Sequence, residues 1–157
     1  MVNSEPMEEM TYEKWTELIR SGSDEDLLGT LLELDEEDII SYVSYANNEI
    51  CNGGFFQYYS NAIFDAKKHI EFLHKLEMNV MADLLQQSLN IFPDSIQPVR
   101  KEDDLEPIDE IVLQAIGSKD RFHDIESQYY KICFSLDTPF ADWIRKNSDY
   151  YWQSTTQ

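Results

Sequence analysis

Apolar residues recur every three or four positions along most of the chain, which is the spacing of one face of an α-helix. No stretch shows the sustained apolar and polar alternation between hairpin turns that is typical of a half-buried strand. The pattern therefore predicts an all-α fold. We expect a single compact domain over residues 1–157, built from about seven to nine short helices, with flexible tails over 1–10 and 153–157.

Capping residues predict where the N-terminal helices begin. Thr11 is expected to cap a first helix, Ser23 a second over 24–34, and Asp35 a third that runs to residue 51. The third helix has an apolar stripe at helical spacing, formed by Ile39, Ile40, Val43, Ala46 and Ile50. These three helices should bury their apolar faces against the rest of the domain.

The triplet Asn52-Gly53-Gly54 is predicted to end the third helix. Gly53 is expected to hold the left-handed conformation, which glycine tolerates at helix C-termini. A short aromatic segment over 55–61 follows. Because it has no neighbouring Lys or Arg, we expect it to pack in a core or an interface and not to stack on nucleic-acid bases.

Further helices are predicted beyond residue 64. Their expected caps are Asp65, Asn79, Ser118 for a helix over 119–134, and Thr138, which Pro139 follows in the first turn. The polar, proline-containing stretch over 94–110 is expected to be the one long loop. A short helix over 108–116 should end before Gly117.

The composition indicates a soluble domain with its own core. Apolar residues make up 42% and aromatics 13%, which is enough for a chain of this length to fold without disulfides. Cys51 and Cys133 lie outside any CxxC pattern and are predicted to be buried thiols in a reducing compartment. With no signal-peptide pattern and no apolar run of membrane-spanning length, we expect a cytoplasmic protein.

The net charge of the chain restricts the kind of molecule that it can be expected to bind. The chain has 31 acidic and 12 basic residues and a net charge of −19. Direct binding to nucleic acid or to an anionic membrane is electrostatically opposed, because both attract Lys and Arg. A basic protein would instead be attracted to this chain.

The acidic residues are unevenly distributed, since no Lys or Arg occurs from 21 to 66. A second base-free block covers 102–110. Helical neighbours stand about 5–6 Å apart at Cβ, so rows of carboxylates can approximate the phosphate spacing of DNA. The alternative is a solvated surface that only aids solubility and complements helix dipoles. The residues predicted to bind a partner are Asp24, Glu25, Asp26, Glu33, Asp35, Glu36, Glu37, Asp38 and Glu49.

No catalytic or cofactor motif is present: GxGxxG, GxxxxGK[ST], HExxH and GxSxG are all absent. Two carboxylate–imidazole pairs at i, i+3, Glu71 with His74 and Asp120 with His123, resemble part of a di-iron ligand set. They leave a metal-dependent enzyme as an alternative of a different class. Because the remaining ligands are missing, we predict solvated histidines, no metal, no cofactor and no enzymatic activity.

The middle of the chain resembles a known family. Its motif runs Asn-Gly-Gly-Phe-Phe-Gln-Tyr-Tyr-Ser-Asn over 52–61. This is similar to the signature of a mostly uncharacterised family of bacterial helical domains named after a DNA-mimic protein. The matching residues are Asn52, Gly53, Gly54, Phe55, Gln57, Tyr58, Tyr59 and Asn61. The order of later elements is also similar, so the resemblance covers about 49–144. It departs at Ala62, where the pattern has a glycine.

The resemblance implies an all-helical fold, dimerisation and no enzymatic activity. It implies structural roles for the motif: the glycines cap, Gln57 and Asn61 satisfy buried backbone groups, and the aromatics pack. A homodimer would use aromatic surface in excess of one small core, from Phe55, Phe56, Tyr58, Tyr59, Trp143 and Trp152.

The leading hypothesis is a non-enzymatic acidic binding protein. As a DNA mimic, it would occupy the basic nucleic-acid-binding surface of a partner protein. The alternative within the same class is an immunity-type inhibitor of a basic toxin.

Overall fold

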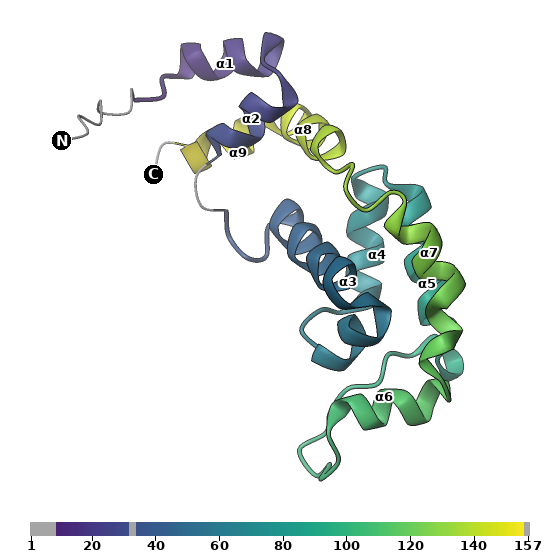
Figure 1. Ribbon diagram of the computed structural model, residues 1–157. Coiled ribbons are helices and arrows are strands. Elements are labelled where there is room, and N and C mark those ends of the chain that lie inside the picture. Colours follow the sequence, from purple (N-terminus) through teal and green to yellow (C-terminus); the bar gives the residue numbers. More distant parts are fainter. Residues whose placement is uncertain (1–8, 32–33, 156–157) are drawn as a thin grey trace, which may run out of the picture. The chain divides into compact units, whose positions relative to one another are not determined.

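The computed structural model describes residues 9–31 and 34–155. Within these ranges every regular element is a helix, so the all-α prediction is confirmed, and nine α-helices are found where seven to nine were expected. The chain divides into two compact units, one formed by 1–34 and 137–157 and the other by 35–136 (Figure 1). Each unit is described by itself, and a single domain over the whole chain stays a prediction.

The first unit contains α1 (Tyr12–Ser21), α2 (Asp24–Thr30), α8 (Asp137–Lys146) and α9 (Ser148–Thr155). The predicted caps of its first two helices are confirmed. Thr11 Oγ1 accepts the Lys14 N–H at 3.2 Å, and Ser23 Oγ accepts the Asp26 N–H at 3.1 Å. α2 ends at Thr30, short of the predicted 34. The core contains Trp15, Leu27, Phe140, Ala141, Ile144 and Tyr151.

The C-terminal part of this unit differs from the prediction. α8 begins at Asp137, so Thr138 lies inside the helix; its hydroxyl donates to Asp24 Oδ2 at 2.8 Å. α9 reaches Thr155 and includes residues that were expected to be a tail. Burial accounts for this helix, because Tyr151 is fully buried and the Trp15 indole N–H donates to the Ser148 carbonyl at 3.2 Å.

The second unit contains five α-helices and two short 3₁₀ turns within 35–136 (Figure 1). The elements are α3 (Ile39–Asn61), α4 (Ala66–Lys75), α5 (Asn79–Leu89), η1 (Pro93–Ser95), α6 (Ile108–Ile116), η2 (Lys119–Phe122) and α7 (His123–Tyr130). α4 packs on α5, and α3 contacts α4, α6 and α7. None of the helices in the described part of the chain is both long and apolar enough to cross a bilayer.

Helix α3 begins three residues later than a cap at Asp35 would place it. Asp38 is the N-cap, and its carboxylate accepts the Ile40 N–H at 2.9 Å. Asp35 instead forms a preceding turn, accepting the Glu37 N–H on its carboxylate at 2.9 Å and the Asp38 N–H on its carbonyl at 2.9 Å. Both aspartates stabilise local backbone, as short acidic side chains commonly do, but only the second caps the helix.

The break in α3 lies at Gly54, so the prediction for Gly53 is wrong. Gly54 has φ 76° and ψ −175°, a conformation that essentially only glycine adopts, whereas Gly53 stays within the helical run. The break frees the Phe55 N–H, which donates to Glu126 Oε1 of α7 at 2.9 Å. A Cβ on Gly54 would lie 2.4 Å from that same oxygen. The predicted aromatic segment is therefore a helical turn beyond the break.

Ala62, the residue directly after the motif, stands where the family pattern has a glycine. Ala62 ends α3 in the left-handed region, with φ 53° and ψ 29°. A non-glycine residue there carries strain of roughly 1–2 kcal/mol. The glycine of the family pattern is thus what this backbone favours, and the turn forms here without it.

The remaining elements contain two further corrections. Asn79 does not cap α5: Met78 holds that position without a side-chain bond, and Asn79 Oδ1 lies 2.9 Å from His74 Nδ1. Ser118 caps only η2, and the predicted helix over 119–134 is confined to η2 and α7, because the next amides bond three residues back. The Asp65 cap and the helix over 108–116 are confirmed.

Candidate protein-binding surface

The acidic residues predicted to bind a partner fall in both units. Glu33 lies outside the described residues. Asp24, Glu25 and Asp26 form the first turn of α2. Asp35, Glu36, Glu37 and Asp38 lie directly before α3, and Glu49 lies within this helix. We consider the two groups separately, and in each group some carboxylates are bound within the protein while others are free.

In the first unit, Asp24 connects α2 to α8. Its Oδ1 lies 2.8 Å from Arg145 Nη2, and its Oδ2 accepts the Thr138 hydroxyl. The hydrogen bond from Thr138, followed by the Arg145 guanidinium, lowers the pKa of this carboxyl. Glu25 and Asp26 are exposed, and in the described part of the chain their carboxylates form no ion pair.

In the second unit, the segment over 35–38 shows the same division. Asp38 is buried at 7% exposure and caps α3, and the Asp35 carboxylate is bound to the backbone of its own turn. Glu36 and Glu37 are exposed, and no ion pair joins either side chain to another described residue. These two carboxylates are therefore available to a partner.

Glu49 is held by the family motif. Its Oε2 accepts a hydrogen bond from Asn61 Nδ2 at 2.6 Å and another from Gln57 Nε2 at 3.3 Å. Gln57 and Asn61 thus contact a carboxylate and not the buried backbone groups that were expected. Because the break at Gly54 lies between Glu49 and its two donors, this half-buried side chain ties the two halves of α3 together.

The aromatic residues of the motif form the core, as predicted. Phe55, Tyr58 and Tyr59 are completely buried. The Phe55 ring meets Tyr129 edge-on at 5.4 Å, and the Tyr59 hydroxyl lies 2.7 Å from Ser88 Oγ. Fully buried rings cannot form a dimer contact in this conformation, so a homodimer, which stays a prediction, would need other residues.

His69 is buried, which corrects the expectation of solvated histidines. Its Nδ1 lies 3.0 Å from the Tyr58 hydroxyl, and its Nε2 is without a hydrogen-bond partner in the described structure. Burial lowers the pKa of His69 to about 3, so the imidazole is neutral at pH 7.

Both carboxylate–imidazole pairs are exposed, and Glu71 and His74 contact other residues instead of each other. Glu71 pairs with Lys75 at 3.4 Å, and His74 contacts Asn79. Among the residues that the structure describes, no group of three or more His, Cys, Asp and Glu side chains is placed to hold a metal ion. The absence of enzymatic activity stays a prediction.

The two cysteines, distant in sequence, are neighbours in the second unit. Both are free thiols; Cys133 is buried and Cys51 half-buried. Burial, followed by the interaction with Cys133, raises the pKa of the Cys51 thiol to about 12. Such a thiol is protonated at neutral pH and reacts slowly.

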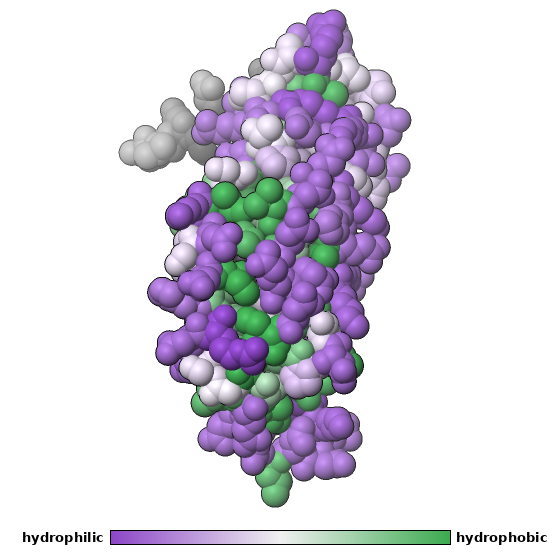
Figure 2. Space-filling model, turned by 90° about the vertical axis from the view of Figure 1, so that its right-hand side faces the viewer, coloured by the Kyte–Doolittle hydropathy of each residue, from purple (hydrophilic) through white to green (hydrophobic). Residues whose placement is uncertain are grey.

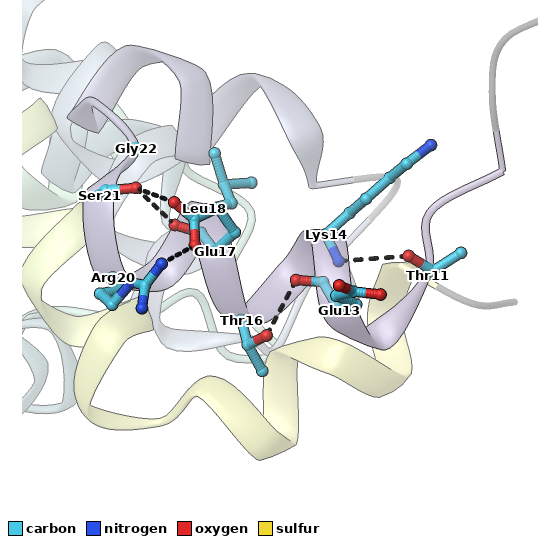
Figure 3. A pocket seen from close by; sticks show the side chains of 9 residues that line it. All are labelled: Thr11, Glu13, Lys14, Thr16, Glu17, Leu18, Arg20, Ser21 and Gly22. Atoms are coloured by element: carbon cyan, nitrogen blue, oxygen red, sulfur yellow. Dashed lines mark hydrogen bonds and ion pairs between the residues drawn. The ribbon is translucent and has the colours of Figure 1, made fainter.

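A broad hollow runs along α1, but the side chains around it are bonded to one another (Figure 3). Arg20 pairs with Glu17, the Ser21 hydroxyl reaches both the carbonyl and the carboxylate of Glu17, and the Thr16 hydroxyl donates to the Glu13 carbonyl. The hollow is thus the outer surface of a single helix, and we find no converging group there for a ligand.

A groove on the second unit combines acidic and apolar residues, and we call it the α3 groove. Tyr42, Tyr45 and Glu49 line it from one face of α3, and the turn after α3 contributes Ile63 and Phe64. Its volume is about 490 Å³, within the usual range of binding pockets. The complete lining is Glu36, Glu37, Tyr42, Tyr45, Asn48, Glu49, Ile63, Phe64 and Lys68.

Tyr42 fixes the geometry of the α3 groove. Its hydroxyl accepts the Asp65 N–H at 2.8 Å and donates to the Asp65 carbonyl at 3.3 Å, and its ring meets Phe64 edge-on at 5.2 Å. The turn that contains Ile63 is therefore held against α3. Sequence reasoning found the acidic rim of this groove but missed its apolar side. The helical spacing of Tyr42, Tyr45 and Glu49, which places them on one face of α3, was the signal in the sequence that could have indicated this surface.

Other apolar side chains also reach the surface. On the face shown in Figure 2, hydrophobic residues lie in a strip bordered by hydrophilic ones. Exposed apolar residues of the second unit outside the α3 groove include Val80, Ile96, Val99, Leu105 and Phe134. They provide apolar area for further contacts, such as the predicted dimer.

Comparison with known proteins supports the resemblance. The family model of the DMP19-like proteins matches residues 32–147, which include the complete central motif. No curated protein and no solved structure matches the chain.

Proposed function

The chain belongs to the DMP19-like protein family, and from that premise we propose that it is a non-enzymatic, acidic binding protein. As a DNA mimic, it occupies the basic nucleic-acid-binding surface of a partner protein. The observation that carries this proposal is that Glu36 and Glu37 are exposed and form no ion pair with any other described residue, on a chain of net charge −19. Unpaired carboxylates keep their full attraction for a basic surface.

Two further acidic groups support the proposal. Glu25 and Asp26 are exposed on the first unit. On the second unit, most acids of the loop before α6 and of the first turn of α6 are exposed, namely Glu102, Asp103, Glu106, Asp109 and Glu110. Surface charges of one sign repel each other and cost stability, so their accumulation favours a role in binding.

We also propose a cytoplasmic location and a homodimer. Two free thiols without a disulfide are typical of a reducing compartment. A dimer would keep the acidic surface away from its two-fold interface, because like charges meeting there would repel.

The test is affinity capture from a lysate at low and at raised salt, with competition by duplex DNA. A partner held through exposed charges should be released as salt rises and displaced by DNA. Glu36→Lys/Glu37→Lys should abolish capture while the variant stays folded. Asp38 is left unchanged, because its replacement would remove the cap of α3.

The matched control is Asp83→Lys/Asp124→Lys, which makes the same change in net charge at two other exposed positions of the second unit. It should retain the captured partner. Equal recovery by the wild type and by Glu36→Lys/Glu37→Lys would refute a role for this part of the surface, and a partner insensitive to both salt and DNA would refute mimicry.

A further inference from the structure

The α3 groove exposes apolar surface that the fold of its own unit does not cover. Tyr45 is 58% exposed and Ile63 is 64% exposed, and both line the groove, the first from α3 and the second from the turn after it. The Phe64 ring, which lies against Tyr42, lines the same groove. Covering such side chains with an apolar group of a partner would be favourable, at about 25 cal/mol for each Å² removed from water.

Acidic side chains surround this apolar surface. Three carboxylates, Glu36, Glu37 and Glu49, line the groove together with one base, Lys68. The Lys68 ammonium lies over the Tyr42 ring, 4.9 Å from its centroid, and no ion pair joins it to a described carboxylate. The lining of the groove therefore combines an excess of negative charge with exposed apolar side chains.

We infer that the α3 groove binds a basic segment of the partner that carries one bulky apolar side chain, which is seated between Tyr45 and Ile63. The inference rests on the proposed function and specifies the partner's contact. Arg or Lys residues beside the anchor face Glu36 and Glu37. Affinity then has an electrostatic part that salt weakens and an apolar part that salt does not weaken.

Charge complementarity selects this occupant over others. Nucleic acid would place phosphates against the three carboxylates and is opposed. A second copy of this chain would bring a body of net charge −19 against the same carboxylates. A purely basic segment would leave the exposed faces of Tyr45 and Ile63 in water, whereas an apolar anchor covers them.

The experiment uses the full chain and two fluorescein-labelled peptides, with affinities measured by fluorescence anisotropy. Both peptides alternate Arg and Gly and differ only at the centre, where one carries Phe and the other Ala. The Phe peptide should bind about tenfold more tightly than the Ala peptide, as expected for a partly buried aromatic side chain.

Three variants locate the contact. Tyr45→Ser/Ile63→Ser should reduce the preference for Phe to about twofold or less, because it removes the apolar walls. Val80→Ser/Phe134→Ser alters two exposed apolar residues outside the groove and should leave the preference unchanged. Glu36→Gln/Glu37→Gln should weaken both peptides by the same factor and reduce their salt dependence. Circular dichroism checks that each variant is folded.

The outcomes separate this inference from the proposed function. Equal binding of the two peptides, a preference that survives Tyr45→Ser/Ile63→Ser, or no binding of either peptide overturns the inference. The proposed function is judged by the capture experiment with Glu36→Lys/Glu37→Lys, so it can stand while the groove inference fails. If capture itself shows no dependence on salt, DNA or Glu36 and Glu37, the proposed function fails first.

Discussion

The buried centre of the second unit and the acidic segment before α3 differ in how many of their polar side chains have a hydrogen-bond partner within the protein. In the centre, most polar side chains have a specific partner: Asn47 donates to the Cys133 carbonyl and accepts the Tyr129 hydroxyl. In the segment over 35–38, Asp35 and Asp38 are bound to backbone, but Glu36 and Glu37 are left to solvent. Stability depends on the first region, and the proposed function depends on the unpaired groups of the second.

The largest expected effect on stability comes from the centre. Gly54→Ala should lower the free energy of unfolding by about 2 kcal/mol or more, because Ala is strained at φ 76° and its Cβ would approach the Glu126 carboxylate. Gly29→Ala is the control, since a Cβ there would meet no described atom within 4 Å apart from its chain neighbours and its own helix backbone. It should be neutral or stabilise by about 0.5–1 kcal/mol. Urea unfolding measures both, and equal effects would contradict a special role for Gly54.

A pH effect should come from His69. Its pKa is about 3 in the fold and about 6.5 when unfolded, so below pH 6.5 the unfolded chain takes up a proton that the native state does not. This contribution to stability is complete above pH 6.5 and is lost as the pH falls towards 3. Between pH 7 and 5.5 the loss should be about 1 kcal/mol.

Denaturant unfolding at the two pH values measures this loss. His69→Asn should remove the pH dependence, whereas His74→Asn, at an exposed histidine, should preserve it. A wild-type stability that does not change over this range would show that His69 is accessible to protons.

An effect on the free energy of unfolding of at most the same size should come from Asp38, at the start of α3. Asp38→Ala should destabilise by about 1 kcal/mol, because the Ile40 N–H loses its acceptor at the start of α3. Asp38→Asn keeps a capping oxygen and should cost less. Thermal unfolding ranks the two variants. If both were equally stable, the cap would not contribute.

The smallest effect is expected at the exposed carboxylates. Glu36→Gln/Glu37→Gln should change the free energy of unfolding by less than about 0.5 kcal/mol, since neither side chain has a partner to lose within the described structure. The same variant should weaken partner binding, and chemical denaturation measured alongside capture tests the contrast. A large loss of stability would show that Glu36 and Glu37 stabilise the fold, contrary to this prediction.

Local signals in the sequence were sufficient where structure is local. Thr11, Ser23 and Asp65 cap helices as predicted. Each is a capping residue directly before apolar residues at helical spacing, which is the local signal for a helix start. The residues near the motif do not determine whether α3 breaks at Gly53 or at Gly54. The acceptor that determines it, Glu126, belongs to α7, and nothing near the motif indicates that contact.

The candidate site was predictable only in part. The base-free stretch indicated Glu36 and Glu37, but it does not separate them from Asp38, which has the same charge and is buried as the cap of α3. Ile63 and Tyr45 line the same groove only because the chain turns after α3, where Ala62 adopts positive φ. Spacing along the chain does not predict such a tertiary contact.

The shielded thiols of the second unit make a reporter possible. Cys133 is buried, and the pKa of Cys51 is raised to about 12, so maleimide reagents should modify both slowly at neutral pH. Asn48→Cys would place a solvent-exposed thiol on the α3 groove. A fluorophore attached there would sense an occupant directly in the otherwise native chain, without prior removal of either cysteine.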